Sequence, residues 1–218
     1  MAMNTYYKEE LYPLQDKVLA AINAINSPFY LTGGTALSRC YFNHRYSDDL
    51  DLFVNKDAAF VENAEKIIAL LEKSHNIMIN AKSKTFYSVQ LDNKLKIDLV
   101  DDIAAHFGSL NKHAIYSKID NPLNILSNKI SAVISREEPK DAVDIWIVTK
   151  NIDVYWKQIF VDVASKAVGI FPPNVAAKLD TFPLELLEQI KWVEGAKPIK
   201  ETFKKDIDKI ISDILEVK

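Results

Sequence analysis

Two carboxylates separated by one residue, Asp49 and Asp51, point most directly to chemistry in this sequence. Around them Leu50, Leu52 and Val54 alternate with other residues, which predicts a strand with both acids on one face. Like charges at close range repel, and a divalent cation with hard oxygen ligands, Mg²⁺ or alternatively Mn²⁺, would keep both ionised. The alternative is a charged strand edge or a turn cap without a metal, because so short a motif is common by chance.

A glycine pair lies upstream of these acids. Gly33 and Gly34 end the apolar run at residues 29–31 and precede a helical pattern. Backbone amides at a helix start attract anions, and the missing side chains let a phosphate approach the backbone. Thr35 adds a hydroxyl donor. The glycines could instead form only a tight turn, but a phosphate cradle followed closely by two carboxylates is what a nucleoside triphosphate bound through magnesium requires.

A third carboxylate, Asp98, lies on a predicted hairpin. Residues 85–91 and 94–100 alternate as strands and are separated by an Asp-Asn turn. On the second strand Asp98 shares a face with Lys96, opposite the apolar residues. Asp98 is therefore either a third site carboxylate or a surface residue balanced by Lys96.

A predicted helix over residues 140–150 is apolar on all sides yet carries Asp141 and Asp144. Buried carboxylates need a cation or strong donors. The available partners are Lys129, on a predicted helix that opens at Pro122, and Arg136 and Lys140. Such a pair could be purely structural.

The sequence Gly-Gly-Thr-Ala-Leu, followed by Arg45-x-Ser47-x-Asp49-Leu-Asp51-Leu-Phe, resembles the core of the polymerase-beta-type nucleotidyltransferase superfamily. Within it the chain most resembles the abortive-infection (AbiEii/AbiGii-type) toxin family, over about residues 29–146. A lysine, an arginine and a Lys-Asp-x-x-Asp segment, which recur in that family, match Lys129, Arg136 and residues 140–144.

This resemblance implies a site for transferring a nucleoside monophosphate to an acceptor hydroxyl. The implied magnesium ligands and catalytic acids are Asp49, Asp51 and Asp98, and Lys129 and Asp141 complete the catalytic set. The implied nucleotide-binding residues are Gly33, Gly34, Thr35, Arg45, Ser47 and Lys129. Arg45 and Ser47 alternatively brace the turn before the strand. Asp144 is expected to orient its neighbours or to be a structural residue.

The resemblance further implies a toxin of a toxin-antitoxin system, with the 3′ end of tRNA or another RNA as acceptor and a cognate antitoxin as partner. Lys82, Lys84, Lys94 and Lys96 could contact an RNA backbone or be merely solubilising. Two rival functions are transfer to a small molecule, as in antibiotic-modifying enzymes, and a nucleotide-binding or interaction module without catalysis. Three intact acids argue against the second rival.

Composition sets broad limits on these functions. The 218 residues, 48% hydrophobic and 26% charged, are ordinary for a globular protein. A net charge of −3 gives no overall attraction to nucleic acid. The single cysteine, Cys40, is typical of a reducing cytosol and is expected to pack rather than react. Without a leader pattern or a long apolar stretch, we expect a cytoplasmic protein with no membrane partner.

Periodicity predicts the elements that must position the site. Helical patterns cover residues 9–25 and 57–71, and several more follow residue 121. We therefore expect an α/β (α+β) fold, with a small mixed sheet flanked by helices and a helical C-terminal portion. The expected domains are a nucleotidyltransferase core at residues 1–120 and a helical domain at residues 121–218 that completes the active site.

Overall fold

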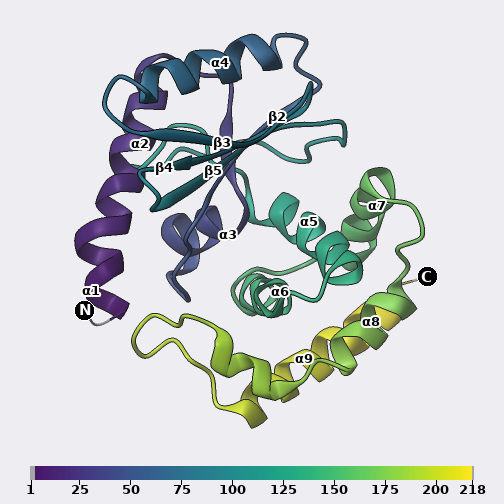
Figure 1. The fold of residues 1–218 in the computed structure, drawn as a ribbon. Helices are drawn as coiled ribbons and strands as arrows, with labels where there is room; N and C mark the ends of the chain where they lie inside the picture. Colours follow the sequence, from purple (N-terminus) through teal and green to yellow (C-terminus); the bar gives the residue numbers. More distant parts are fainter. Residues whose placement is uncertain (1–2, 218) are drawn as a thin grey trace. The chain divides into compact units, whose positions relative to one another are not determined.

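The computed structural model describes residues 3–217, which form two compact units (Figure 1). Residues 3–40, 46–103 and 109–120 make up the first, here called the sheet unit. Residues 41–45, 104–108 and 121–217 make up the second, the helical unit. The short segments 41–45 and 104–108, which the expected domain boundaries assign to the core, thus belong to the helical unit.

The sheet unit is built on a mixed sheet with the strand order β1-β2-β5-β4-β3. Its strands are β1 (Tyr30–Thr32), β2 (Leu50–Asn55), β3 (Ile77–Lys82), β4 (Phe86–Leu91) and β5 (Leu95–Asp102). β2 and β5 run parallel, whereas the other neighbouring strands are antiparallel. The predicted α/β class with a small mixed sheet is confirmed.

One face of this sheet is apolar and covered by helices. Side chains alternate between buried and half-buried along β2 and β5, as the sequence pattern predicts. β2 begins at Leu50, however, so Asp49 precedes the strand that was predicted to carry both acids. Helix α4 (Phe60–Leu71) lies along the sheet (Figure 1), and Phe60 makes edge contacts with the rings of Tyr87, at 5.6 Å, and Phe29, at 5.9 Å. The opposite face carries Asp51 and Asp98, together with the half-buried Phe53 and Val100.

The predicted hairpin turn is present between β4 and β5. Asp92 and Asn93 have φ values of 50° and 54°, the left-handed pair of a type I′ turn, in which the Lys94 N–H donates to the Leu91 carbonyl at 2.9 Å. β3 was not predicted; it extends the sheet by pairing with β4, and its register shifts between Ile79 and Ala81.

The N-terminal helical segment begins earlier than the predicted residue 9. Helix α1 (Met3–Tyr6), a π-helical turn η1 (Tyr7–Leu11) and helix α2 (Tyr12–Ala24) follow one another without a break. Pro13, a residue that an α-helix tolerates best in its first turn, therefore lies inside a longer helical run. The π turn, in which the Tyr12 N–H reaches back to the Tyr7 carbonyl, shifts the hydrogen-bond ladder just before this proline, which has no N–H to donate.

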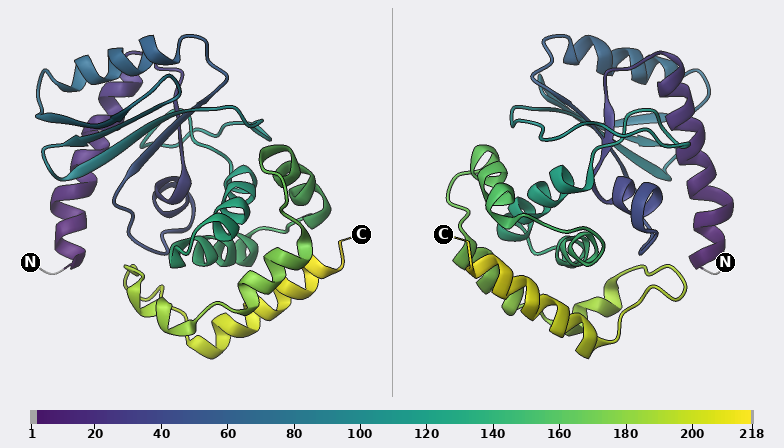
Figure 2. Two further views of the ribbon diagram at one scale, coloured as in Figure 1. Left: turned by 45° about the vertical axis from the view of Figure 1, so that its right-hand side comes forward. Right: turned by 180° about the vertical axis from the view of Figure 1, so that it is seen from behind.

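The helical unit contains a closely packed set of helices. Their bounds are α5 (Pro122–Ser135), α6 (Pro139–Asn151), α7 (Trp156–Lys166), α8 (Pro172–Asp180), η3 (Leu184–Gln189) and α9 (Lys200–Leu215). α5 packs against α6, α7 and α8, and α9 packs against α6 and lies beside α8 (Figure 2). Among the helical patterns predicted after residue 121, the segment Leu184–Gln189 is a 3₁₀ helix and not an α-helix. Within residues 3–217, no helix is both long and apolar enough to cross a membrane.

Candidate active site

Asp51 and Asp98 face each other across the central strand pair of the sheet unit. They are register partners on the parallel strands β2 and β5, and so project from the same face. The Asp98 side chain is 14% exposed, and its Oδ1 is buried without a hydrogen-bond partner among residues 3–217. A buried carboxylate oxygen without a donor is costly unless a ligand satisfies it.

The glycine turn leads from β1 into a helical segment, α3 (Gly33–Ala36) and the π turn η2 (Leu37–Phe42). Gly33 has φ +68°, a conformation that strains other residues. A Cβ placed on Gly33 would lie 2.4 Å from Asp51 Oδ2. The missing side chain therefore gives the Asp51 carboxylate its place beside the turn.

Thr35 and Ser47 brace the chain on either side of Asp49. The buried Thr35 hydroxyl donates to the Asp49 carbonyl and lies 2.9 Å from Ser47 Oγ. Gln15 also donates to the carbonyl of Ser47 at 3.2 Å. These bonds favour the bracing alternative for the Ser47 side chain, and they leave phosphate binding at this turn to backbone amides.

Lys96 lies beside the acids, as expected from the alternative in which Lys96 balances the charge of Asp98. Its Nζ donates to Asp98 Oδ2 at 2.6 Å. Burial opposes the charge on Lys96, but the hydrogen bond to Asp98 and the charges of Asp98, Asp49 and Asp51 raise its pKa. Within residues 3–217, no three His, Cys, Asp or Glu side chains are gathered as a ready metal site. The donor chemistry still fits a hard divalent cation, because the groups are carboxylates and one Asp98 oxygen has no hydrogen-bond partner within these residues.

Lys129 and Asp141 meet inside the helical unit. The Lys129 ammonium lies 2.8 Å from Asp141 Oδ1 and 2.6 Å from Asp144 Oδ2, and all three side chains are buried. Arg136, half exposed, also binds Asp141, at 2.7 Å. Burial opposes the charge of Asp141, but Arg136 and Lys129 keep the pKa of its carboxyl below the usual value. The pairing proposed from sequence is present; its catalytic role stays a prediction.

Asp144 is held by two residues from the segment 41–45. The Arg45 guanidinium binds both Asp144 oxygens at 2.8 Å, and His44 Nε2 lies 3.0 Å from Oδ1. Burial opposes this charge too, but Arg45, Lys129 and the hydrogen bond from His44 hold the Asp144 pKa well below its ordinary value. This geometry favours the bracing alternative for Arg45. His44 was missed as a member of this cluster, since nothing in the sequence pairs residues 100 positions apart.

The comparisons with known proteins bear on the family and the fold of this chain. The family model for the nucleotidyl transferase AbiEii toxin of type IV toxin-antitoxin systems matches residues 17–213. The chain belongs to this family. It is accordingly an enzyme of the nucleotidyltransferase class, and the resemblance stated from its motifs is confirmed. The comparison with curated proteins found no match.

Solved structures share the fold of this AbiEii family member. MenT4, a nucleotidyltransferase toxin from Mycobacterium tuberculosis, has a TM-score of 0.64 at 12% identity, covering 99% of this chain and 86% of its own. A protein from H. pylori assigned as a nucleotidyltransferase has a TM-score of 0.60 at 18% identity, covering 94% and 95%. The antibiotic-resistance factor ANT(2″)-Ia has a TM-score of 0.54 at 16% identity, covering 70% and 88%. At these identities the likeness concerns the fold.

The buried His44 of this AbiEii family member should make its stability depend on pH. Burial lowers the His44 pKa, and Nδ1 is buried with no hydrogen-bond partner in the described part of the chain, so protonation would place an unbonded N–H in the core. The unfolded chain therefore takes up this proton first. The free energy of unfolding should fall as the pH drops below the ordinary histidine value of 6.5, by up to about 1.4 kcal/mol per pH unit.

Urea unfolding at about pH 7.5 and about pH 5.5 measures this dependence. His44→Gln is the matched variant, because its amide can still donate to Asp144 but does not titrate. We expect the variant to lose less stability between the two pH values. Equal losses in both proteins would assign the dependence to other groups.

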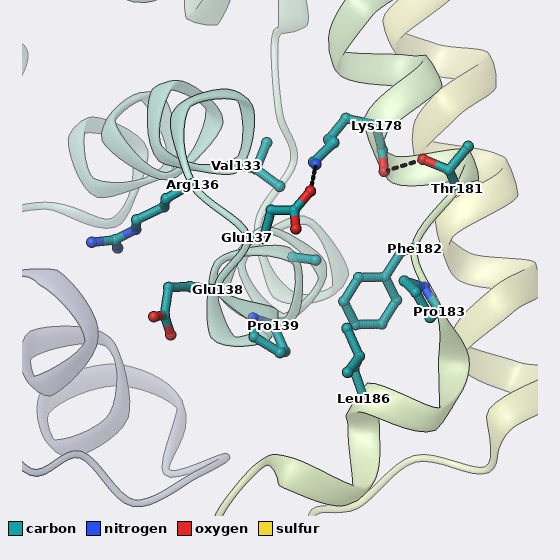
Figure 3. Close-up of a pocket in the computed structure, with 11 residues that line it drawn as sticks. Val133, Arg136, Glu137, Glu138, Pro139, Lys178, Thr181, Phe182, Pro183 and Leu186 are labelled. Carbon is teal, nitrogen blue, oxygen red and sulfur yellow. Dashed lines mark hydrogen bonds and ion pairs between the residues drawn. The ribbon is translucent and has the colours of Figure 1, made fainter.

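A separate cavity of about 200 Å³ opens in the helical unit between α5, α6, α8 and η3 (Figure 3). Its lining includes Val133, Pro139, Phe182 and Leu186, with Lys178 bonded to Glu137 at its rim. None of the predicted site residues lines it.

The lysines considered as an RNA contact are mostly engaged with carboxylates. Lys82 binds Glu65, and Lys94 binds Glu10 at 2.7 Å. Together with the Lys96–Asp98 pair, these contacts favour a solubilising role over a basic patch for RNA.

Proposed function

We propose that this AbiEii family member is a magnesium-dependent nucleotidyltransferase that moves a nucleoside monophosphate from a nucleoside triphosphate to a hydroxyl of RNA. The acceptor we favour is the 3′ end of tRNA, and Mn²⁺ can substitute for Mg²⁺. We place this activity in the cytoplasm, where both substrates are found, and we expect a cognate antitoxin to restrain it.

One observation carries this proposal above the others. Asp51 and Asp98 are paired in register on adjacent strands, and Asp98 Oδ1 is a buried acceptor to which no described residue donates. Gly33 keeps the space beside Asp51 clear of a side chain. The two carboxylates and the glycine turn thus meet within one unit, which is what a metal-bound triphosphate requires.

The predicted site residues divide between metal binding, phosphate binding and proton transfer. Asp49, Asp51 and Asp98 would hold the metal, which supplies charge neutralisation on the triphosphate. The Gly34 and Thr35 amides, at a helix start, bind phosphate oxygens. Asp98 accepts the proton as the acceptor oxygen bonds to the α-phosphorus and the bond to pyrophosphate breaks. Lys129 and Asp141 are proposed to serve the same transfer.

The deciding experiment incubates the protein with each labelled nucleoside triphosphate, Mg²⁺ and total RNA. Label in the tRNA fraction that survives removal of free nucleotide supports the proposal, and Asp98→Asn should abolish it. Labelling of other RNA would revise the acceptor. Transfer only to a small molecule, which is the rival function raised by the sequence, would replace the RNA proposal. Absence of transfer with every acceptor would favour a non-catalytic binding module.

Replacing Gly33 with alanine should lower transfer by disturbing Asp51. The new Cβ would meet Asp51 Oδ2 at 2.4 Å, and the left-handed backbone itself costs about 1–2 kcal/mol with a side chain. We expect a higher Mg²⁺ requirement, measured as the concentration that gives half-maximal transfer.

Gly34→Ala is the matched comparison, because Gly34 lies in the first turn of α3, where alanine is the better helix former. It should preserve the fold and weaken triphosphate binding more than nucleoside binding. Equal loss for both ligands would contradict phosphate binding at this turn.

A further inference from the structure

The Lys96 ammonium lies among the carboxylates proposed to hold the metal. Its hydrogen bond of 2.6 Å to Asp98 Oδ2 joins two side chains on the same face of β5. The charges of Asp49 and Asp51 act on the same ammonium. A cation carried by the chain itself therefore offsets part of the negative charge that would attract a divalent ion.

A metal ion and the ammonium compete for this carboxylate. A divalent ion on Asp98 would repel an ammonium that keeps its present distance from Oδ2, and the repulsion is strong where water is partly excluded. The Lys96 side chain is 40% exposed and has a flexible four-carbon stem, so the ammonium can move into solvent. The ammonium bonds Oδ2, and Oδ1 has no partner among the described residues.

We propose that Lys96 is a built-in competitor of the metal, whose ammonium neutralises the site carboxylates until a divalent cation displaces it from Asp98. The inference rests on the metal role proposed above for Asp98. It gives Lys96 two effects: it stabilises the sheet unit when no metal is bound, and it raises the metal concentration that the site needs.

The test measures Mn²⁺ binding to the full chain without nucleotide, by calorimetry. Lys96→Met keeps the length of the side chain and removes its charge, and we expect binding on the order of tenfold tighter, because one charge-assisted hydrogen bond no longer has to be broken. Lys96→Arg should bind Mn²⁺ no more tightly than wild type. Lys94→Met is the matched control and should leave binding unchanged, since Lys94 pairs with Glu10 instead.

Thermal unfolding gives a second readout that does not depend on activity. Without metal, Lys96→Met should melt earlier than wild type, because the site carboxylates lose their counter-ion. Mn²⁺ should raise its melting temperature by more than it raises that of wild type. If Lys96→Met does not fold, Lys96→Gln takes its place in both measurements.

The outcomes separate this inference from the proposed function. If Asp98→Asn abolishes Mn²⁺ binding but Lys96→Met binds no tighter than wild type, the competition is refuted and the metal site stands. If no Mn²⁺ binds, or binding ignores Asp98→Asn, the metal site fails and the competition fails with it. If Lys96→Met mainly weakens nucleotide binding in EDTA, Lys96 is a phosphate contact and the competition is again refuted.

Discussion

Asp51→Asn is expected to abolish the gain in triphosphate binding that magnesium brings, and to lower transfer by at least about a thousandfold. The physical reason is that a metal ligand supplies several kcal/mol of charge stabilisation in the transition state, and each 1.4 kcal/mol is about tenfold in rate. The fold should be unharmed or slightly stabilised, because Asp49 and Asp98 lose a like-charged neighbour. Triphosphate binding with and without Mg²⁺, together with the melting temperature, measures both effects.

The control for this variant is Asp208→Asn, which removes an exposed carboxylate from a helical ion pair with Lys204. It should change neither binding nor transfer, since such surface pairs contribute little. Magnesium-dependent binding that persists unchanged in Asp51→Asn would remove Asp51 from the metal site.

The second large effect concerns Lys129 and Asp141. If both serve catalysis, Lys129→Ala and Asp141→Ala should each eliminate transfer and cellular toxicity. The double variant should be little worse than either, because residues that act as a unit are not additive. Breaking a buried pair also costs about 3–5 kcal/mol. We expect the lower end of this range for Lys129→Ala, because Arg136 still binds Asp141 and Arg45 still binds Asp144.

Asp144→Asn separates the catalytic role of this pair from the structural one. Asp144 shares the same ammonium at 2.6 Å but is expected only to orient its neighbours. The Asp144→Asn variant should therefore have a lower free energy of unfolding but retain transfer activity per folded molecule. If Asp144→Asn stops transfer as completely as Lys129→Ala does, or if Lys129→Ala retains transfer per folded molecule, the specific catalytic role of the pair is refuted.

The sheet could be predicted where the signal is local. Alternation assigned Asp51 and Asp98 to polar faces, and the Asp92–Asn93 turn marked the hairpin. The parallel register that sets Asp51 opposite Asp98 is non-local, so no pattern within either strand shows it. β3 was missed because its side chains are mostly exposed and its pairing shifts at Ile79, so its sequence lacks the alternation of a half-buried strand.

In the candidate site, too, local features could be predicted and contacts between distant residues could not. Asp141 required a partner because its helix is apolar all round, and Lys129 provides it. The sequence left two roles open for Arg45, binding the nucleotide or bracing the turn, because a motif specifies residue types and not their contacts. His44 entered no prediction, since its partner Asp144 comes from a helix 100 positions later. The π turn before Pro13 likewise has no established sequence signature.

The helical unit is formed from separate stretches of the chain, and this limits how two such enzymes can be recombined. His44 and Arg45, which hold the buried Asp144 of α6, are encoded far upstream of the other helices of that unit. A chimaera of two relatives with one junction after Asp120 would take Arg45 from one parent and Asp144 from the other. A mismatch there would leave a buried charge without its guanidinium. Functional crossovers should therefore be those in which positions 44, 45 and 144 come from the same parent or are identical in both.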